Sequence, residues 1–379
     1  MNKRNMLPEG TRDIILDDCI IKRTLERKID DLFKSWGYSE IVTPTLEFYE
    51  TFNNKVSLNE EDMYKFFDNK GHILVLRPDM TIPIARVMQT KLKDEKLPVK
   101  MRYSSNVFRV HESLLGKRNE FTDCGVENIG SSDIESDFEM IVLALEALKN
   151  LGLKNFKLEI GNIGFFKSVL KSVDIGDDEK KKLASLIQNK SLKNLEDYLD
   201  SLNISEEYKR FFNKLPWMFG GREILNEAKK LVFNRELKEN LDYLEDIYNN
   251  VEKMGYGENV TFDLGLVLRL NYYTGIIFRG YCDKVGDTIL RGGRYDKLIK
   301  IKDKYVPSVG FSITVDSLIE NMKESGTYKK EEKVILYYNP DKKIEAVNKS
   351  NELRKNGQIV SMISSNYISD FKIVKGVEK

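Results

Sequence analysis

Residues 107–129 constrain the fold of this 379-residue chain more than any other stretch, because their sequence, VFRVHESLLGKRNEFTDCGVENI, predicts a β-hairpin. Residues 107–111 and 120–129 are two extended runs. The polar residues between them, 112–119, include Gly116 and predict the connecting loop. Since hairpins join antiparallel strands, an antiparallel sheet is the expected centre of the fold.

One face of the second predicted strand carries two carboxylates. Side chains alternate along a strand, so Asp123, Gly125 and Glu127 point to the same side. Like charges on one face repel, and a cationic ligand or Arg109 on the partner strand could compensate them. Gly125 leaves a gap where a small molecule could lie flat on the strand. A solvated face with an ion pair from Arg109 to either carboxylate explains this stretch equally well.

Composition and charge exclude several classes of protein. A hydrophobic content of 41% over 379 residues is enough for two or three domains. The 61 basic and 60 acidic residues give a net charge of +1, which argues against tRNA and against an acidic membrane surface as partners. The first residues lack an apolar signal region, and no window approaches 18 uninterrupted apolar residues. We expect a cytoplasmic protein with no membrane partner.

The cysteines and histidines are too few for a stabilising cross-link. The chain has three widely spaced cysteines, Cys19, Cys124 and Cys282, and two histidines, His72 and His111. This pattern predicts neither a disulfide framework nor a structural zinc site.

Three further segments before and after the hairpin have clear signals. An amphipathic helix is predicted from Asp17 or Asp18 to Gly37, and an extended run over 38–46 contains Pro44, which places it at a sheet edge or a subunit contact. The sequence SDIE at 132–135 is a capping box and predicts the start of a helix that Gly152 ends.

Charged residues follow a second apolar strand, residues 73–76, as the sequence RPDMT at 77–81. Loops at strand ends are exposed while the strand holds them rigid, so they commonly carry binding residues. The Arg77-Pro78-Asp79 cluster is therefore a candidate place for a binding residue. A surface ion pair between Arg77 and Asp79 at a turn is the simpler interpretation.

The predicted elements indicate an α+β fold with a mixed, mainly antiparallel sheet that is flanked by helices. Strand periodicity after the middle of the chain occurs at 260–270, 275–282, 288–290 and 309–313, and a helix is predicted at 314–322. We divide the chain into a core in two parts, 1–163 and 256–325, a helical insertion at 164–255, and a short βαβ-like α/β tail at 333–379. The tail, with strands at 334–338 and 359–363 and a helix at 341–356, is short for an independent domain.

Several segments, in this order, resemble the catalytic core of histidyl-tRNA synthetase, a class II aminoacyl-tRNA synthetase, over roughly residues 7–322. Besides the hairpin, which resembles motif 2, they are PEGTRD at 8–13, a motif-1-like dimer element at 37–44, LRPDMT at 76–81, NYYTGIIF at 271–278 and GGRYD at 292–296. The resemblance implies a class II synthetase-like core.

The resemblance also implies a histidine-binding pocket made of Asp79, Thr81, Arg109, Asp123, Glu127, Tyr272, Tyr273 and Tyr295. In the family pattern the α-ammonium group is held at the positions of Asp79, Thr81 and Asp123, and the α-carboxylate at Arg109. Glu127 and Tyr273 fall at the imidazole positions, with the other two tyrosines alongside. A zwitterion with an imidazole needs acceptors, a guanidinium fork and a hydroxyl, and this set supplies them. No metal and no cofactor is implied.

Departures from the synthetase pattern fall on the ATP chemistry. Leu268 and Ser317 stand where the synthetase has arginines, and Arg269 points to the opposite face of the strand from Leu268. His111 and Lys117 also replace synthetase residues in the hairpin, and we assign His111 no catalytic role. Losing one transition-state donor typically costs about 10²- to 10³-fold in rate. The sequence therefore predicts negligible adenylate formation.

A chain that keeps the amino-acid pocket without this chemistry resembles the regulatory subunits of ATP phosphoribosyltransferase, which act at the first step of histidine biosynthesis. LRPDMT and NYYTGI are closer to these subunits than to working synthetases. The resemblance implies a non-catalytic subunit, dimeric within a hetero-octamer, that activates a short-form catalytic subunit and mediates feedback inhibition by histidine. A functional histidyl-tRNA synthetase and a stand-alone histidine sensor are the alternatives.

Overall fold

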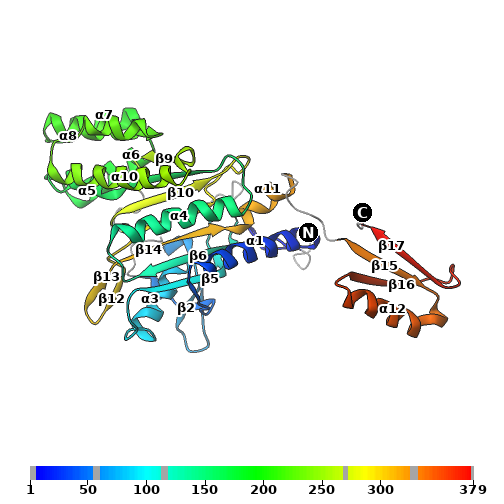
Figure 1. Ribbon diagram of the computed structural model, residues 1–379. Helices are drawn as coiled ribbons and strands as arrows, with labels where there is room; N and C mark the ends of the chain where they lie inside the picture. Colours follow the sequence, from blue (N-terminus) through cyan, green and yellow to red (C-terminus); the bar gives the residue numbers. More distant parts are fainter. Residues whose placement is uncertain (1–5, 54–59, 112–117, 268–271, 325–331, 377–379) are drawn as a thin grey trace. The chain divides into compact units, whose positions relative to one another are not determined.

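A computed structural model describes residues 6–53, 60–111, 118–267, 272–324 and 332–376 (Figure 1). The chain forms two compact units, Met1–Asn321 and Met322–Lys379. Leu268, Arg269 and Lys117 lie outside the described residues, so the structure does not test the substitutions expected at Leu268 and Lys117 or the direction expected for Arg269.

The first unit is built on a nine-stranded sheet. In spatial order its strands are β1 (Ser39–Glu40), β5 (Val99–Phe108), β6 (Glu120–Ile129), β14 (Ser308–Thr314), β11 (Leu290–Arg294), β10 (Ile276–Tyr281), β7 (Lys157–Asn162), β9 (Val260–Asp263) and β8 (Phe219–Gly220). The neighbours from β5 to β7 are antiparallel, whereas β1–β5 and β7–β9 are parallel. The prediction of a mixed, mainly antiparallel sheet is confirmed.

The predicted hairpin is β5 and β6. The bounds of β6 agree with the prediction, but β5 begins at Val99, eight residues before the predicted start at 107. The polar residues Arg102, Ser104 and Ser105 hid this extension, because they break the apolar pattern of a strand. Edge strand β1 ends before Pro44, which agrees with the expected edge position.

Helices α1 (Leu16–Ser35) and α4 (Ile134–Asn150) cover one face of the sheet (Figure 1). The predicted apolar face of α1 is buried at Ile21, Leu25 and Ile29. The predicted capping residue of α4 is wrong by one position. Asp133, not Ser132, is the N-cap, because its carboxylate accepts a hydrogen bond from the backbone N–H of Ser136 at 2.9 Å.

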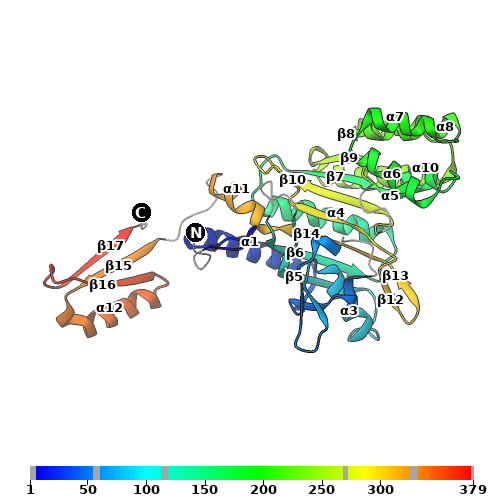
Figure 2. The same cartoon turned by 180° about the vertical axis from the view of Figure 1, so that it is seen from behind.

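A smaller layer packs on the other side of β5 and β6. It contains the three-stranded sheet β2 (Leu46–Phe48), β4 (Ile73–Leu76) and β3 (Lys65–Phe67), the helical segments α2 (Glu50–Asn53), η2 (Glu60–Asp62) and α3 (Thr81–Thr90), and the hairpin β12 (Ile299–Ile301) with β13 (Lys304–Val306). Figure 2 shows α3 beside this hairpin. Val75, Ile84 and Met88 join Tyr103, Tyr272 and Tyr295 in one buried apolar cluster, so this layer closes over the tyrosines.

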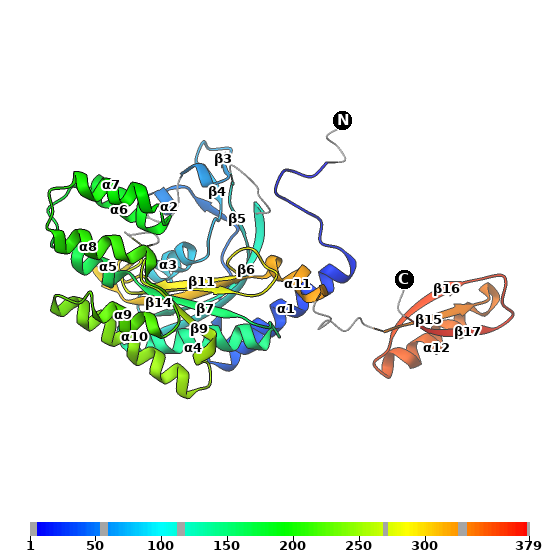
Figure 3. The ribbon, with the colours of Figure 1, turned by 90° about the horizontal axis from the view of Figure 1, so that it is seen from above.

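Helices between β7 and β9 gather near one end of the sheet (Figure 3). They are α5 (Ile163–Leu170), α6 (Asp177–Gln188), α7 (Leu192–Ser201), α8 (Glu206–Lys214), η3 (Leu215–Trp217), α9 (Glu223–Lys229), α10 (Arg235–Lys253) and η4 (Gly257–Asn259). The two-residue strand β8 within this segment pairs with β9 and was not predicted. Strand β9 ends at Asp263 rather than near 270, because the Asp263 carboxylate accepts from the N–H of Gly265 and starts a turn.

A buried ion pair connects these helices to the core. Arg294 of β11 lies 2.7 Å from the carboxylate of Asp137 in α4, and both residues are buried. Tyr243 of α10 donates a hydrogen bond to the other oxygen of Asp137 at 2.6 Å. One carboxylate therefore joins the sheet, its covering helix and the helical segment.

The second unit is a three-stranded sheet with one helix. Strand β15 (Lys333–Tyr338) lies between β16 (Ile359–Ser364), which is parallel to it, and β17 (Phe371–Gly376), which is antiparallel. The helical segments of this unit are η6 (Pro340–Lys342) and α12 (Lys343–Lys355). The single helix that was predicted earlier in the chain, at 314–322, is instead η5 (Val315–Leu318) followed by α11 (Ile319–Glu324). Val334, Leu336, Ala346 and Val360 form the small core of the unit. Strand β17 was not predicted.

Over the described ranges, none of the helices is both long and apolar enough to cross a membrane. Cys19, Cys124 and Cys282 are free thiols, and only Cys19 is exposed. The same part of the chain contains no cluster of His, Cys, Asp and Glu side chains that could hold a metal ion.

The glycine pair in β11 makes room for two aromatic residues. A Cβ atom at Gly292 would lie 2.4 Å from Cβ of Phe311 and 2.5 Å from the ring of Phe278. We predict that Gly292→Ala lowers the free energy of unfolding by about 1–3 kcal/mol, because overpacking forces buried side chains to move. Urea unfolding of the full chain measures this change. Gly286→Ala is the control, since a Cβ there meets nothing within 4 Å; equal stabilities of the two variants would contradict the prediction.

Candidate functional site

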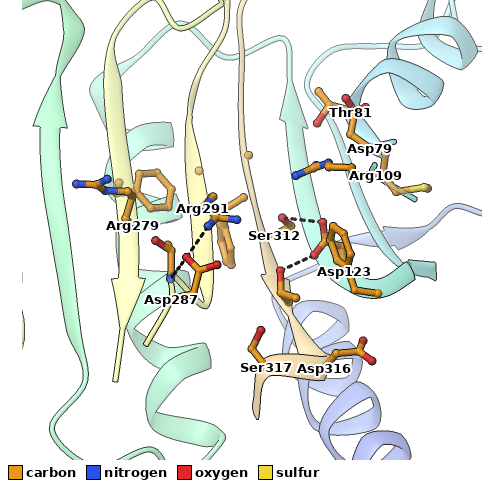
Figure 4. A pocket seen from close by; sticks show the side chains of 18 of the residues that line it. Asp79, Thr81, Arg109, Asp123, Arg279, Asp287, Arg291, Ser312, Asp316 and Ser317 are labelled. Carbon is orange, nitrogen blue, oxygen red and sulfur yellow. Dashed lines mark hydrogen bonds and ion pairs between the residues drawn. The ribbon is translucent and has the colours of Figure 1, made fainter. Parts of the chain in front are cut away.

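A cavity of ≈ 830 Å³ lies on the face of the nine-stranded sheet opposite α1. Lys22 of α1 donates to Thr122 at 2.6 Å, which fixes the face of β6 that α1 covers. Asp123 and Glu127 lie at positions of opposite parity to Thr122 and therefore line the cavity on the other side of the sheet. Figure 4 shows Asp123 in this wall. The cavity wall includes all the residues that the resemblance assigned to histidine binding: Asp79, Thr81, Arg109, Asp123, Glu127, Tyr272, Tyr273 and Tyr295.

Glu127 is the most deeply buried acid of the cavity, with 2% of its surface exposed. One carboxylate oxygen accepts from the hydroxyl of Thr81 at 2.8 Å, and the other accepts from the hydroxyl of Tyr295. Burial raises the pKa of Glu127 to about 7, although these two hydrogen bonds act in the opposite direction. This carboxyl group can therefore gain or lose a proton near neutral pH.

Asp123 lies on the same strand, four residues closer than Glu127 to the hairpin loop. Its carboxylate accepts hydrogen bonds from Thr314 at 2.8 Å and Ser312 at 3.4 Å, both on β14 (Figure 4). Burial raises the pKa of Asp123, and the positive charge of Arg109 opposes that shift. The hydroxyl groups of β14 therefore replace part of the water that the carboxylate has lost.

The gap expected above Gly125 is filled by a side chain. Tyr103 lies directly opposite Gly125 in the β5–β6 register, and a Cβ at Gly125 would lie 2.4 Å from the Tyr103 hydroxyl oxygen. The expectation that a ligand lies flat on this glycine is wrong, because the glycine accommodates the tyrosine ring. Tyr103 lines the cavity between the two acids and was missed in the sequence. Its cross-strand position opposite a glycine is the signal that could have identified it.

Arg109 follows the end of β5 and reaches the cavity from the loop side. Its Nε donates to the carbonyl oxygen of Pro78 at 2.8 Å, and its guanidinium lies 5.4 Å from the ring centre of Phe121. These contacts hold Arg109 in the cavity wall, where its positive charge acts on Asp123.

Asp79 and Thr81 lie at the start of α3. Asp79 accepts from the backbone N–H of Ile82 at 3.0 Å, so one of its oxygens stabilises the first turn of the helix. The alternative interpretation, a surface ion pair between Arg77 and Asp79, is wrong. Arg77 is buried, and it donates to the carbonyl oxygens of Thr43 at 2.7 Å and Asn106 at 2.8 Å.

Three tyrosines form an aromatic wall. The ring of Tyr272 stacks on Tyr295 with centroids 5.6 Å apart, and Tyr273 meets Tyr272 edge-on at 4.8 Å. Lys167 of α5 donates to the carbonyl oxygen of Tyr273 at 2.8 Å. Burial and the neighbouring lysines Lys297 and Lys171 lower the pKa of Lys167 to about 8. Helix α5 thus holds one end of the wall.

The cavity wall also carries charged residues that were not predicted. They are Arg12, Arg118, Arg279, Lys284, Asp287, Arg291, Asp316 and Glu320. Arg291 lies 3.1 Å from Asp287 (Figure 4). Arg279 donates to Glu159 at 3.0 Å. Ser317, one of the residues that replace a synthetase arginine, is in the cavity wall. His111 is also there and its backbone N–H donates to Asn119 at 3.2 Å.

Comparisons with known proteins agree with this fold. The family described as "Histidyl-tRNA synthetase" matches residues 10–318. A histidyl-tRNA synthetase from Nostoc sp. PCC 7120 has the same fold, with a TM-score of 0.77 and 22% identity over 94% of this chain and 85% of that one. The class II synthetase-like architecture is therefore established.

More similar proteins share a different name. An ATP phosphoribosyltransferase regulatory subunit from Caldanaerobacter subterraneus subsp. tengcongensis is 42% identical over 358 residues, 94% of this chain and 93% of that protein. One from Clostridium botulinum (strain Langeland) is 42% identical over 342 residues, 89% of this chain and 81% of that protein. The crystal structure of an "ATP phosphoribosyltransferase regulatory subunit/histidyl-tRNA synthetase" from Bacillus halodurans has a TM-score of 0.86, 33% identity, and coverage of 97% and 94%. The chain therefore belongs to the ATP phosphoribosyltransferase regulatory subunit family, on a histidyl-tRNA synthetase-like fold.

Proposed function

We propose that this chain binds free histidine in the cavity on β6 and regulates a separate ATP phosphoribosyltransferase catalytic subunit. In this proposal it is a non-catalytic subunit, dimeric within a hetero-octamer with the short-form catalytic subunit. It activates that subunit, and histidine binding reverses the activation. Histidine can inhibit only if it binds the inhibited arrangement more tightly than the active one.

The observation that carries the proposal is the buried carboxyl of Glu127, whose pKa lies near 7 and which faces a cavity lined by tyrosines. An imidazole titrates in the same pH range, with an unperturbed pKa of about 6.5. A carboxyl group and an imidazole of matched pKa can share one proton in a strong hydrogen bond. The tyrosine rings give the imidazole an apolar contact surface.

The remaining residues fit the amino-acid end of histidine. Asp123 and Asp79 are acceptors for an ammonium group, and Arg109 can bind a carboxylate with its terminal nitrogens. We assign Thr81 a supporting role as well as ligand contact, because its hydroxyl already donates to Glu127. The arrangement supports recognition of a whole amino acid rather than of a free imidazole.

We also propose a division of roles along the chain. Residues 1–163 and 256–325 form the synthetase-like core that holds the ligand, and 164–255 is an insertion. The tail, 333–379, adds a small α/β unit with its own core cluster.

Replacing the Glu127 carboxylate tests the imidazole assignment. We predict that Glu127→Gln weakens histidine binding by about 10- to 100-fold, because a hydrogen bond to a charged group contributes about 1.5–3 kcal/mol. Calorimetric titration of the full chain with histidine measures the affinity. Glu120→Gln is the control, since Glu120 lies on β6 but its side chain bonds Asn106 on the opposite face. Unchanged affinity in Glu127→Gln would remove the assignment.

The proton shared by the Glu127 carboxyl and the histidine imidazole predicts a pH optimum for histidine binding. In the complex, Glu127 and the imidazole hold one proton together. Above about pH 7 both free partners are deprotonated, so binding must take up a proton; below about pH 6.5 both are protonated, so binding must release one. We predict the tightest binding between these values and about tenfold weaker binding at pH 5 and at pH 8.5. Glu127→Gln should lose the alkaline decline; a wild-type affinity independent of pH would contradict the shared proton.

An assay for adenylate formation from histidine and ATP distinguishes this function from that of a synthetase. With Ser317 and Leu268 in place of arginines, we predict that ATP–pyrophosphate exchange dependent on histidine stays at background. A working histidyl-tRNA synthetase assayed in parallel provides the positive control. Robust exchange by the purified chain would favour the synthetase alternative.

A further inference from the structure

A second surface, on the helical segment, is exposed and shares no residue with the cavity. The Trp217 surface consists of Leu192, Lys193, Arg210, Lys214 and Trp217. These residues, with Glu196 and Asn213, line an open hollow of ≈ 590 Å³. The indole of Trp217 is 58% exposed and Leu192 is 39% exposed.

The local sequence holds Trp217 in this position. Leu215 and Pro216, the first two residues of η3, are buried, and they anchor the turn whose last residue is Trp217. Folding therefore fixes the backbone of Trp217 while its large apolar ring stays in water. Exposed apolar surface beside charged residues is typical of an interaction site.

Two of the three positive charges of this surface, Arg210 and Lys214, have no acidic partner among the residues that the structure describes. Arg210 and Lys214 are one helical turn apart on α8, and both are exposed. Within the described ranges, neither side chain forms an ion pair or a hydrogen bond, whereas Lys193 is paired with Asp197 at 2.8 Å. Two cations beside an exposed indole can therefore pair with acidic groups of another molecule.

We propose that the Trp217 surface docks the catalytic subunit, through a protein surface that offers carboxylates around an apolar site for the indole. This inference rests on the proposed function, since it concerns the same partner. Tryptophan and arginine are the residues most enriched at the energetic centres of protein interfaces. Complementary charges also raise the association rate and select the partner.

Charge favours a protein over a nucleic acid as the occupant. A protein on DNA typically makes about 6–10 phosphate contacts. The Trp217 surface offers two cations that pair with none of the described residues, and the carboxylates of Glu196 and Asp197 lie beside Lys193. These acids would repel a phosphate backbone, whereas a protein surface with mixed groups accommodates them.

The experiment uses the full chain and its short-form catalytic subunit. Assembly is followed by sedimentation velocity for the wild type, Trp217→Ala and Lys214→Glu. We expect each variant to raise the dissociation constant of the complex at least about tenfold, with unchanged histidine affinity and unchanged unfolding midpoint. The matched controls are Lys238→Glu, an exposed lysine on α10, and Tyr305→Ala, an aromatic residue that is 60% exposed on β13. Both controls should assemble like the wild type.

The possible outcomes separate the two proposals. Wild-type assembly by both surface variants would overturn the docking surface while the proposed function stands. Failure of the wild-type chain to bind the catalytic subunit would overturn both. If Trp217→Ala loses self-association but binds the catalytic subunit normally, a second copy of this chain occupies the surface. If Lys214→Glu loses tRNA binding, a nucleic acid occupies the surface. Either result overturns the inference.

Discussion

The buried ion pair between Arg294 and Asp137 joins parts of the first unit that are far apart in the sequence. Besides the carboxylate, the Arg294 guanidinium donates to the carbonyl oxygen of Ser131 at 2.9 Å and to the Ser136 hydroxyl at 2.7 Å. Breaking a buried pair by removing one partner typically costs about 3–5 kcal/mol, because the other charge stays buried. The next residue, Tyr295, binds Glu127 on the opposite face of the chain. The position of the cavity wall thus depends on a pair outside the cavity.

The cavity combines an inner part whose lining residues are almost fully buried with an outer part whose lining residues are charged and exposed. Glu127 and Tyr295 are almost fully buried, while Arg291 and Asp287 face water. In the inner part, burial rather than a charged neighbour has the largest effect on the pKa values of the acids. It raises the pKa of Asp123, and it raises that of Glu127 to about 7.

The second hairpin strand, the main helices and the cavity residues could be predicted from the sequence, because each leaves a local signal: an alternating pattern, an apolar stripe or a motif. Features that depend on pairing between distant strands could not be predicted. Tyr103 enters the cavity only through its register with Gly125, and β17 forms only because β15 offers an unpaired edge. The capping error at Ser132 arose because Asp133, the neighbouring residue, is an equally good cap.

The close approach of side chains to the glycines of the sheet limits how this cavity can evolve. Tyr103 occupies the space above Gly125, and the carboxylate of Glu127 lies 1.9 Å from where a Cβ of Gly310 would be. Neither glycine can acquire a side chain unless the residue facing it shrinks or moves at the same time. A change of ligand preference in this lineage would therefore require paired substitutions on neighbouring strands, and homologues that bind other amino acids should differ at both members of a pair.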